Sequence, residues 1–258
     1  MVQAEAFWRR TLKGITAPTA LVDDRTSGPT SDDGGRFDDQ EVQLSKAATI
    51  DLQRFARQHQ LTLTTIIQGA WALLLSRYSG DTDVVFGMAV SGRSADITSI
   101  NSIVGMFINT LPVRVHVAHE TELVSWLKEL QSQQAETRQY EYTPLAQILK
   151  WSEVPGGLPL FESGFNFDNF PVDQSLQDLQ QSGTETQEPK QNLKIDSVRG
   201  WDQANVPLSL YGRPGSSLNL RLAYNSSRFS RNLVGRMLGS CKRFWWIWSL
   251  DRDSVSVA

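Results

Sequence analysis

Histidine and cysteine are the side chains that most often carry acid–base or nucleophilic chemistry near neutral pH. This chain has three histidines, His59, His116 and His119, and one cysteine, Cys241. The histidines lack a metal-ligand spacing such as HxxxH, and the sequence contains no GxSxG, GxGxxG or Walker loop. We expect the histidines on the solvated surface. Cys241 lies in an apolar segment, and the sequence shows no general base that would activate its thiol. It is therefore more typical of a small core residue than of a nucleophile.

The segment most typical of a functional loop spans residues 84–117, VVFGMAVSGRSADITSINSIVGMFINTLPVRVHV. It begins and ends with apolar runs of strand length, and the first run, from Val84 to Val90, is apolar enough to be covered on both faces. Between the runs lies a long stretch rich in Ser, Gly, Asp and Asn. Loops that leave the end of a core strand often bind or catalyse, so this loop is the first candidate for a site.

Composition bounds the kind of protein. The chain has 258 residues, of which 40% are hydrophobic and 21% charged, and a net charge of -3. These values predict a globular chain with one large domain or two small ones, and no basic stripe indicates a nucleic-acid partner. No apolar run reaches the length of about 18 residues that spans a membrane. A single cysteine and an N-terminus without signal-peptide character lead us to expect a cytoplasmic protein.

Hydrophobic periodicity predicts alternating helices and strands that must position this loop. The predicted helices cover residues 3–14, 46–60, 62–78, 120–138, 143–151 and 230–248. The predicted strands cover residues 40–45, 84–90, 109–117, 160–171, 192–198, 207–213 and 217–225. Ser45 is the expected N-cap of the second helix and Thr143 that of the fifth, and Gly80 is the expected terminator of the third. This pattern predicts an α/β fold: a two-layer sandwich with a mixed β-sheet of about five or six strands and helices packed on one face.

Six segments in one order resemble a known family. They are FWRRTLKG, TLTTIIQGAWALLLSRYSGDTDVVFGMAVSGR, IVGMFINTLPVRV, YTPLAQI, PLFESGFNFDNFP and NVPLSL. Together they resemble the C-terminal lobe of a condensation domain from a nonribosomal peptide synthetase, which has a chloramphenicol-acetyltransferase-like fold. The resemblance covers roughly residues 3–240. We therefore expect residues 1–240 to form this lobe and residues 241–258 to be a divergent C-terminal end.

The resemblance implies a function that needs partners. In the family, two lobes enclose a tunnel, and two carrier proteins deliver their substrates into it on 4′-phosphopantetheine arms. The downstream amine attacks the upstream thioester and an amide forms. No cofactor is implied to bind the lobe directly. The implied partners are the N-terminal condensation lobe, peptidyl or acyl carrier proteins and an adjacent adenylation domain. The family's catalytic signature HHxxxDG belongs to the N-terminal lobe, and this sequence contains no HH, so we expect the chain alone to be inactive.

The same resemblance assigns the loop and one strand to the substrate tunnel. The loop would form the tunnel floor, the backbone at its glycines would allow close approach, and Asn109 would point its amide into the reaction chamber or cap a strand end. Arg93 would either pair with a carboxylate of the other lobe or be solvated, and Arg114 would lie on the outer side of its strand. The segment NVPLSL would begin the latch that reaches the other lobe. The expected tunnel residues are Ser91, Gly92, Arg93, Gly105, Met106, Phe107, Asn109, Asn166 and Asp168.

Two further functions remain open at this point. One is non-catalytic: a carrier-protein-binding or scaffolding lobe, or a degenerate remnant. The other is an isolated acyltransferase that uses an unrecognised base, which the missing histidine pair argues against. The substrates, the stereochemistry of the donor and the distinction from epimerisation or heterocyclisation relatives do not follow from the sequence.

Overall fold

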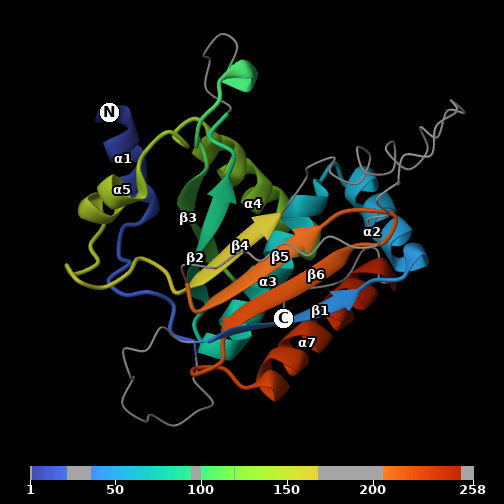
Figure 1. The fold of residues 1–258 in the computed structure, drawn as a ribbon. Helices are drawn as coiled ribbons and strands as arrows, with labels where there is room; N and C mark the ends of the chain where they lie inside the picture. Colours follow the sequence, from blue (N-terminus) through green and yellow to red (C-terminus); the bar gives the residue numbers. More distant parts are fainter. Residues whose placement is uncertain (1, 22–35, 94–99, 119, 168–205, 251–258) are drawn as a thin grey trace, which may run out of the picture.

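Six strands form one twisted mixed sheet in the computed structural model, which describes residues 2–21, 36–93, 100–118, 120–167 and 206–250 (Figure 1). The order across the sheet is β1-β6-β5-β4-β2-β3. β4 pairs in parallel with β2 and β5, and the other neighbours are antiparallel. The strands are β1 (Phe37–Gln43), β2 (Asp83–Val90), β3 (Asn109–His116), β4 (Ser163–Phe167), β5 (Leu208–Arg213) and β6 (Asn219–Asn225). This arrangement confirms the predicted mixed sheet.

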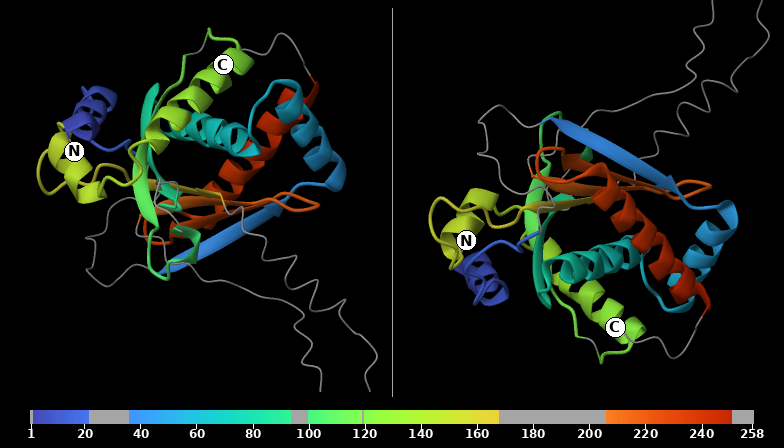
Figure 2. Two further views of the ribbon diagram at one scale, coloured as in Figure 1. Left: turned by 90° about the horizontal axis from the view of Figure 1, so that it is seen from above. Right: turned by 90° about the horizontal axis from the view of Figure 1, so that it is seen from below.

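Four long helices cover one face of the sheet, as predicted (Figures 1 and 2). They are α2 (Lys46–Gln58), α3 (Leu63–Ser79), α4 (Leu123–Arg138) and α7 (Arg231–Leu250). The main core lies between these helices and the sheet. Trp71, fully buried in α3, and Phe86 of β2 belong to this core. Burial of such side chains contributes about 1.5–3 kcal/mol each, so this layer carries most of the stability of the fold.

Residues close by in the sequence set where α2 and α3 begin and where α3 ends, and the roles expected for Ser45 and Gly80 are confirmed. The Ser45 hydroxyl accepts a hydrogen bond from the backbone N–H of Ala48, and the Thr62 hydroxyl accepts one from the N–H of Thr65. Gly80 adopts φ +79°, a left-handed conformation that closes α3 without a Cβ penalty. The cap expected at Thr143 is wrong: α5 (Leu145–Trp151) begins after Pro144, and the Thr143 hydroxyl makes no capping bond.

A second, smaller core lies on the opposite side of β2 and β3. It is formed by α1 (Val2–Thr11) and α5, which lie apart from the four long helices in both views of Figure 2. Trp8 of α1 and Trp151 of α5 are buried there together with Val85 of β2. Helices therefore cover both faces of the sheet at β2 and β3, whereas the prediction placed them on one face only.

One sequence assignment falls differently in the structure. Leu208 and Leu210 of the predicted latch are buried in β5, a central strand, so these residues do not form a segment that leaves the lobe. α7 continues through residue 240, with Cys241 and Phe244 in the main core. The domain boundary expected between residues 240 and 241 stays a prediction, which rests on the divergence of the sequence after residue 240. The strand expected at 192–198 lies outside the described residues.

Candidate functional site

The loop between β2 and β3 leaves the sheet at one end and projects beyond it (Figure 1). Val90 at the end of β2 pairs with Asn109 at the start of β3, so residues 91–108 form the connection. Its described part after residue 99 begins with the short 3-10 helix η1 (Ile100–Ser102). Such a long connection between two antiparallel neighbours is uncommon, because a few residues suffice to join them.

The stem of the loop is closed by contacts between its two limbs. Gly92 has φ +64°, and a Cβ on it would collide with the carbonyl oxygen of Phe107. The Arg93 guanidinium lies over the Phe107 ring, with 4.6 Å from its carbon to the ring centroid. One of its nitrogens, Nη1, donates to the carbonyls of Ile100 at 2.6 Å and Ile103 at 3.2 Å. Arg93 is thus bonded within its own loop, while the expected alternatives, a bridge to the other lobe or solvation, stay predictions.

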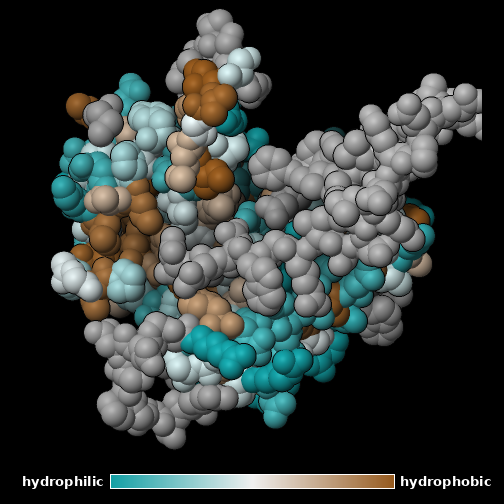
Figure 3. Space-filling model, viewed as in Figure 1, coloured by the Kyte–Doolittle hydropathy of each residue, from teal (hydrophilic) through white to brown (hydrophobic). Residues whose placement is uncertain are grey.

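Beyond this stem the loop presents apolar side chains to solvent. Val104 is 99% exposed, Met106 93% and Ile108 67%, while Ile103 is also exposed. We call Ile103, Val104, Met106 and Ile108 the apolar crest; brown side chains are visible on the projection near the top of Figure 3. A group of exposed apolar side chains is typical of a surface that contacts another molecule. Gly105 in the crest lies beside the Phe107 ring, and Ser91 accepts a hydrogen bond from the Arg93 N–H.

Asn109 is half-buried and bonded within this chain. Its side-chain amide donates to the carbonyls of Glu141 at 2.9 Å and Thr143 at 2.8 Å, and its oxygen accepts from the Thr110 N–H. Both hydrogens of the amide are therefore engaged by the turn between α4 and α5. The side chain holds this turn against the base of the loop.

Asn166 belongs to a row of polar side chains on the face of the sheet that α2, α3, α4 and α7 leave free. Its β4 neighbour Phe165 packs in the main core, so Asn166 lies on the other face, because side chains alternate along a strand. The strand register aligns Asn166 with Tyr211, Tyr211 with Arg221, and Arg221 with Glu41. Asp168 lies outside the described residues.

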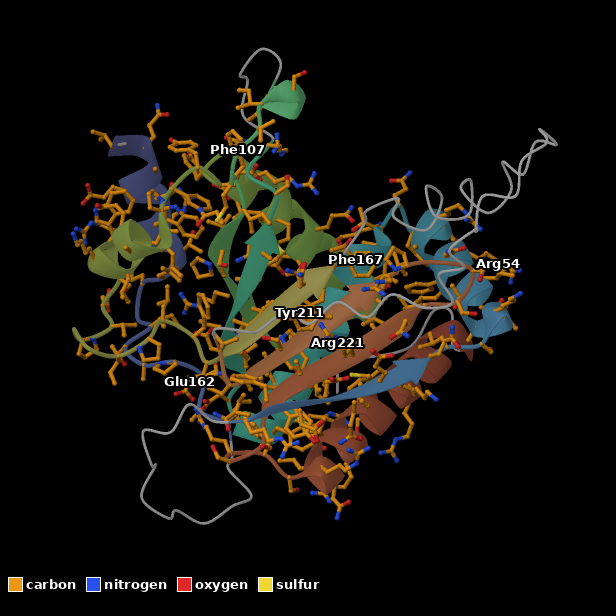
Figure 4. The ribbon with its side chains drawn as sticks, in the orientation of Figure 1. Arg54, Phe107, Glu162, Phe167, Tyr211 and Arg221 are labelled. Carbon is orange, nitrogen blue, oxygen red and sulfur yellow. The ribbon has the colours of Figure 1, made fainter. Side chains whose placement is uncertain are left out.

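The row also contains residues that the sequence did not single out. The Arg221 guanidinium lies over the Tyr211 ring at 4.5 Å, and both residues are labelled in Figure 4 at the centre of the sheet. The sequence did contain an indication of these two residues. In PLSLYGR and SLNLRLAYN, leucines alternate with other residues, which puts Tyr211 and Arg221 on the face opposite the leucines. What alternation does not reveal is that the two residues lie side by side on neighbouring strands.

The side chains with potential for acid–base or nucleophilic chemistry do not come together near the described part of the loop. His116 is exposed at the end of β3, as expected, and His119 lies outside the described residues. His59 is half-buried with its ring 4.6 Å from that of Phe55, so the surface position expected for it is only partly right. Cys241 is fully buried, and burial raises the pKa of its thiol to about 12. A thiol that stays neutral at physiological pH is a poor nucleophile.

Arg114 ties the end of α1 to strands β2 and β3. Its guanidinium forms an ion pair with Asp83 at 2.6 Å and donates to the carbonyls of Thr11 and Lys13 at the end of α1. The hydrogen bond that it donates to Asp83 raises the pKa of Arg114 above its usual range, so the charge is permanent. Arg114 therefore faces α1, not bulk solvent.

The described part of the chain therefore offers binding and positioning groups. Within it, no three His, Cys, Asp or Glu side chains come close enough to hold a metal ion. No helix among the described residues is long and apolar enough to cross a membrane. The projecting loop contributes apolar side chains and backbone groups, and the sheet face opposite the four long helices contributes an amide, a phenol and a guanidinium.

Comparison with known proteins gives one consistent result. The family model described as Condensation domain matches residues 1–245. The chain is 43% identical over 235 residues to a linear gramicidin synthase of Brevibacillus parabrevis, covering 91% of the chain and 3% of that protein. It is 40% identical over 231 residues to chondramide synthase cmdD of Chondromyces crocatus, covering 90% of the chain and 6% of that protein. The chain thus spans a small part of the length of these relatives.

Solved structures share its fold. A holo four-domain nonribosomal peptide synthetase bound to AMP and glycine superposes with a TM-score of 0.83 at 16% identity, covering 99% of the chain and 20% of that protein. The X-domain from teicoplanin biosynthesis superposes with a TM-score of 0.78 at 18% identity, covering 99% of the chain and 56% of that protein. At these identities the likeness concerns the fold alone.

Proposed function

The chain belongs to the condensation-domain family of nonribosomal peptide synthetases, and from this premise we propose that it is the C-terminal half of one such domain. In this role it helps form an amide bond between acyl or aminoacyl groups tethered as thioesters to carrier proteins. It provides the floor of the substrate tunnel, and an N-terminal half provides the proton-handling histidine.

The observation that carries this proposal is the projecting loop. Val104 and Met106 are almost fully exposed on a loop whose stem is pinned by Arg93 and Phe107. An apolar surface held outward in this way is suited to contact with a second body. The chain also covers 56% of the X-domain structure and 53% of a starter condensation domain structure, which supports the assignment to one half.

The reaction assigned to the assembled domain needs little covalent participation from this half. The acceptor amine attacks the donor thioester carbonyl, the C–N bond forms, the C–S bond breaks and the thiol of the donor arm leaves. The amine must lose one proton and the leaving thiolate must gain one. These 258 residues contain no HH pair for that task. Holding two tethered substrates in line is itself worth about 7–11 kcal/mol of the barrier, and this half contributes to that alignment.

The sheet face opposite the four long helices gives the tunnel a polar wall in this proposal. Asn166, Tyr211 and Arg221 follow one another across β4, β5 and β6. The Asn166 amide and the Arg221 guanidinium can donate hydrogen bonds to the amide and phosphate oxygens of a carrier-bound arm. The arm belongs to the substrate and is delivered by the carrier protein.

An assay with two loaded carrier proteins tests the proposed function. The purified chain alone should yield no amide above the uncatalysed background. Addition of an N-terminal half that carries HHxxxDG, taken from the linear gramicidin synthase of Brevibacillus parabrevis, should restore product formation. An N-terminal half with the second signature histidine changed to alanine is the matched control and should restore none.

Two outcomes would contradict the proposal. Product from the chain alone that disappears in a His116→Ala variant would indicate an acyltransferase with its own base. Stable binding of the loaded carrier proteins to the chain, without product when the N-terminal half is added, would favour the non-catalytic carrier-binding alternative.

A further inference from the structure

We propose that Arg93 is a positioning residue that fixes the loop between β2 and β3, so that the apolar crest is held ready for the N-terminal half. This inference rests on the proposed function for the identity of the partner. The arrangement of the loop itself rests on contacts within the chain. Arg93 touches no substrate in this account and acts through the crest.

A single planar group connects the two limbs of the loop. The Arg93 guanidinium donates to the carbonyls of Ile100 at 2.6 Å and Ile103 at 3.2 Å, which precede Val104 in the crest. The same group lies 4.6 Å from the ring centroid of Phe107, which follows Met106. The crest is therefore bracketed by residues that contact one guanidinium.

The backbone around Arg93 is itself held in place. Gly92 takes the left-handed φ of +64° and lies directly against the carbonyl of Phe107. The Arg93 N–H donates to the Ser91 hydroxyl at 3.3 Å. Only a residue without a Cβ fits at position 92, because a Cβ would occupy the space of the Phe107 carbonyl. Arg93 therefore leaves the end of β2 in a defined direction, toward the inside of its own loop.

Without the contacts of Arg93, the hydrophobic effect would favour collapse of the crest onto nearby apolar surface. Val104 and Met106 are 99% and 93% exposed, and burial of such side chains against any nearby apolar surface is favourable. A loop that has collapsed or become mobile must be ordered again when a partner binds, which reduces the affinity. The Arg93 contacts oppose collapse before the partner arrives.

Arginine suits this position better than lysine. A guanidinium is planar, so it can donate in its plane to the carbonyls of Ile100 and Ile103 while its face lies on the Phe107 ring. An ammonium keeps the charge but has no planar face to stack on the ring. The variant Arg93→Lys therefore separates the geometry of this side chain from its charge.

Native-state digestion of the full chain by thermolysin, which cleaves before apolar residues, tests without any partner whether the contacts of Arg93 hold the loop in place. Arg93→Lys and Arg93→Met should raise the cleavage rate within residues 103–108 by about fivefold to tenfold, since hydrogen bonds and a cation–π contact of ordinary strength are lost. Arg57→Lys is the matched control, because Arg57 is exposed on α2, and it should leave the rate unchanged. Circular dichroism and the urea midpoint should not move in any variant. Equal cleavage rates in wild type and both Arg93 variants would overturn the inference.

A second measurement examines the ring contact directly. In the wild-type chain, the side-chain protons of Arg93 should show an upfield shift in the NMR spectrum because of the Phe107 ring current. The shift should vanish in Phe107→Leu, and the cleavage rate should rise as it does for Arg93→Met. An unshifted Arg93 side chain in the wild type would show that the guanidinium does not stack there.

The affinity for the N-terminal half shows whether the contacts of Arg93 matter for the proposed function. Titration of that half into the chain should give an apparent dissociation constant about fivefold to tenfold weaker for Arg93→Lys than for wild type, if the lost contacts must be re-formed on binding. The turnover at saturation should stay within about twofold of wild type. A fall in turnover with unchanged affinity would contradict the role of Arg93 as a positioning residue. If the wild-type chain itself fails to assemble, the proposed function fails, whereas the cleavage and NMR results still decide whether Arg93 orders the loop.

Discussion

At the scale of single residues, Asn109 illustrates how an amide next to a candidate site can have its donors fully engaged elsewhere. Its nitrogen donates to the carbonyls of Glu141 and Thr143, both part of the turn that leads into α5. A carbonyl that loses its partner inside a protein costs about 1–3 kcal/mol. The amide therefore matters for stability whether or not its oxygen also faces a substrate.

Replacement of Asn109 should lower the free energy of unfolding in a graded way. Asn109→Ala should cost about 1–3 kcal/mol, since two half-buried carbonyls lose their donor. Asn109→Asp should cost more at pH 7, because a carboxylate would face the two carbonyl oxygens, and part of this loss should be recovered at acidic pH, where the protonated acid can donate one hydrogen bond. Urea unfolding measures both.

The matched control for this series is Asn232→Ala at the exposed start of α7, which should change the stability by no more than about 0.5 kcal/mol. A stability of Asn109→Ala equal to wild type, together with reduced turnover in the assembled domain, would assign Asn109 to the reaction chamber instead. That result would agree with the role that the family resemblance implied.

At the scale of elements, the loop between β2 and β3 contains a matched pair of glycines. Gly92 has a left-handed φ and no space for a Cβ, whereas the nearest atom to a Cβ on Gly105 is a ring carbon of Phe107 at 3.4 Å. The first glycine is required by the closure of the stem, and the second lies in the exposed crest.

Gly92→Ala should therefore open the loop while Gly105→Ala leaves it nearly unchanged. The left-handed backbone alone costs an alanine about 1–2 kcal/mol, and the collision with the Phe107 carbonyl adds to that cost. Hydrogen exchange should show faster exchange of the Ile103 N–H, which donates to the Ile100 carbonyl, in Gly92→Ala only. Similar exchange rates in the two variants would mean that the stem is not closed by this contact.

At the scale of the whole molecule, the fold has two cores on opposite faces of one edge of the sheet. The larger core lies beneath α2, α3, α4 and α7, and the smaller one beneath α1 and α5. Arg114 ties α1 to the sheet, because it stands on β3 and bonds both Asp83 of β2 and the carbonyls of Thr11 and Lys13 at the end of α1. The stability of α1 should depend on this residue more than that of the main core does.

Arg114→Met should release α1 without unfolding the sheet. The ion pair is about one third exposed, so we discount it and expect a local loss of about 1–2 kcal/mol. Amides of α1 should exchange faster while those of α3 keep their protection. Arg10→Met is the control: its pair with Glu136 is exposed and should contribute less than about 0.5 kcal/mol. Uniformly faster exchange in both helices would show that the chain unfolds as one unit.

Much of this protein was determined by short-range signals that the sequence states directly. Ser45 and Thr62 cap their helices and Gly80 ends α3, because such bonds join residues a few positions apart. The alternation of apolar residues along β3, β5 and β6 indicated which side chains are buried, and the continuous apolar run of β2 indicated burial on both faces. The absence of an HH pair and the order of six family segments indicated the kind of domain and its dependence on a partner.

Tertiary structure alone decided how distant segments meet. The order of the strands, with β4 parallel to both neighbours, placed Leu208 and Leu210 in a central strand and put Tyr211 beside Arg221. Asn109 found its acceptors in the turn before α5, and Arg114 found its own at the end of α1. These partners lie far along the chain, so no local pattern encodes them. Their choice depends on the packing of the two cores, which brings one particular carbonyl, and no other, within reach of each donor.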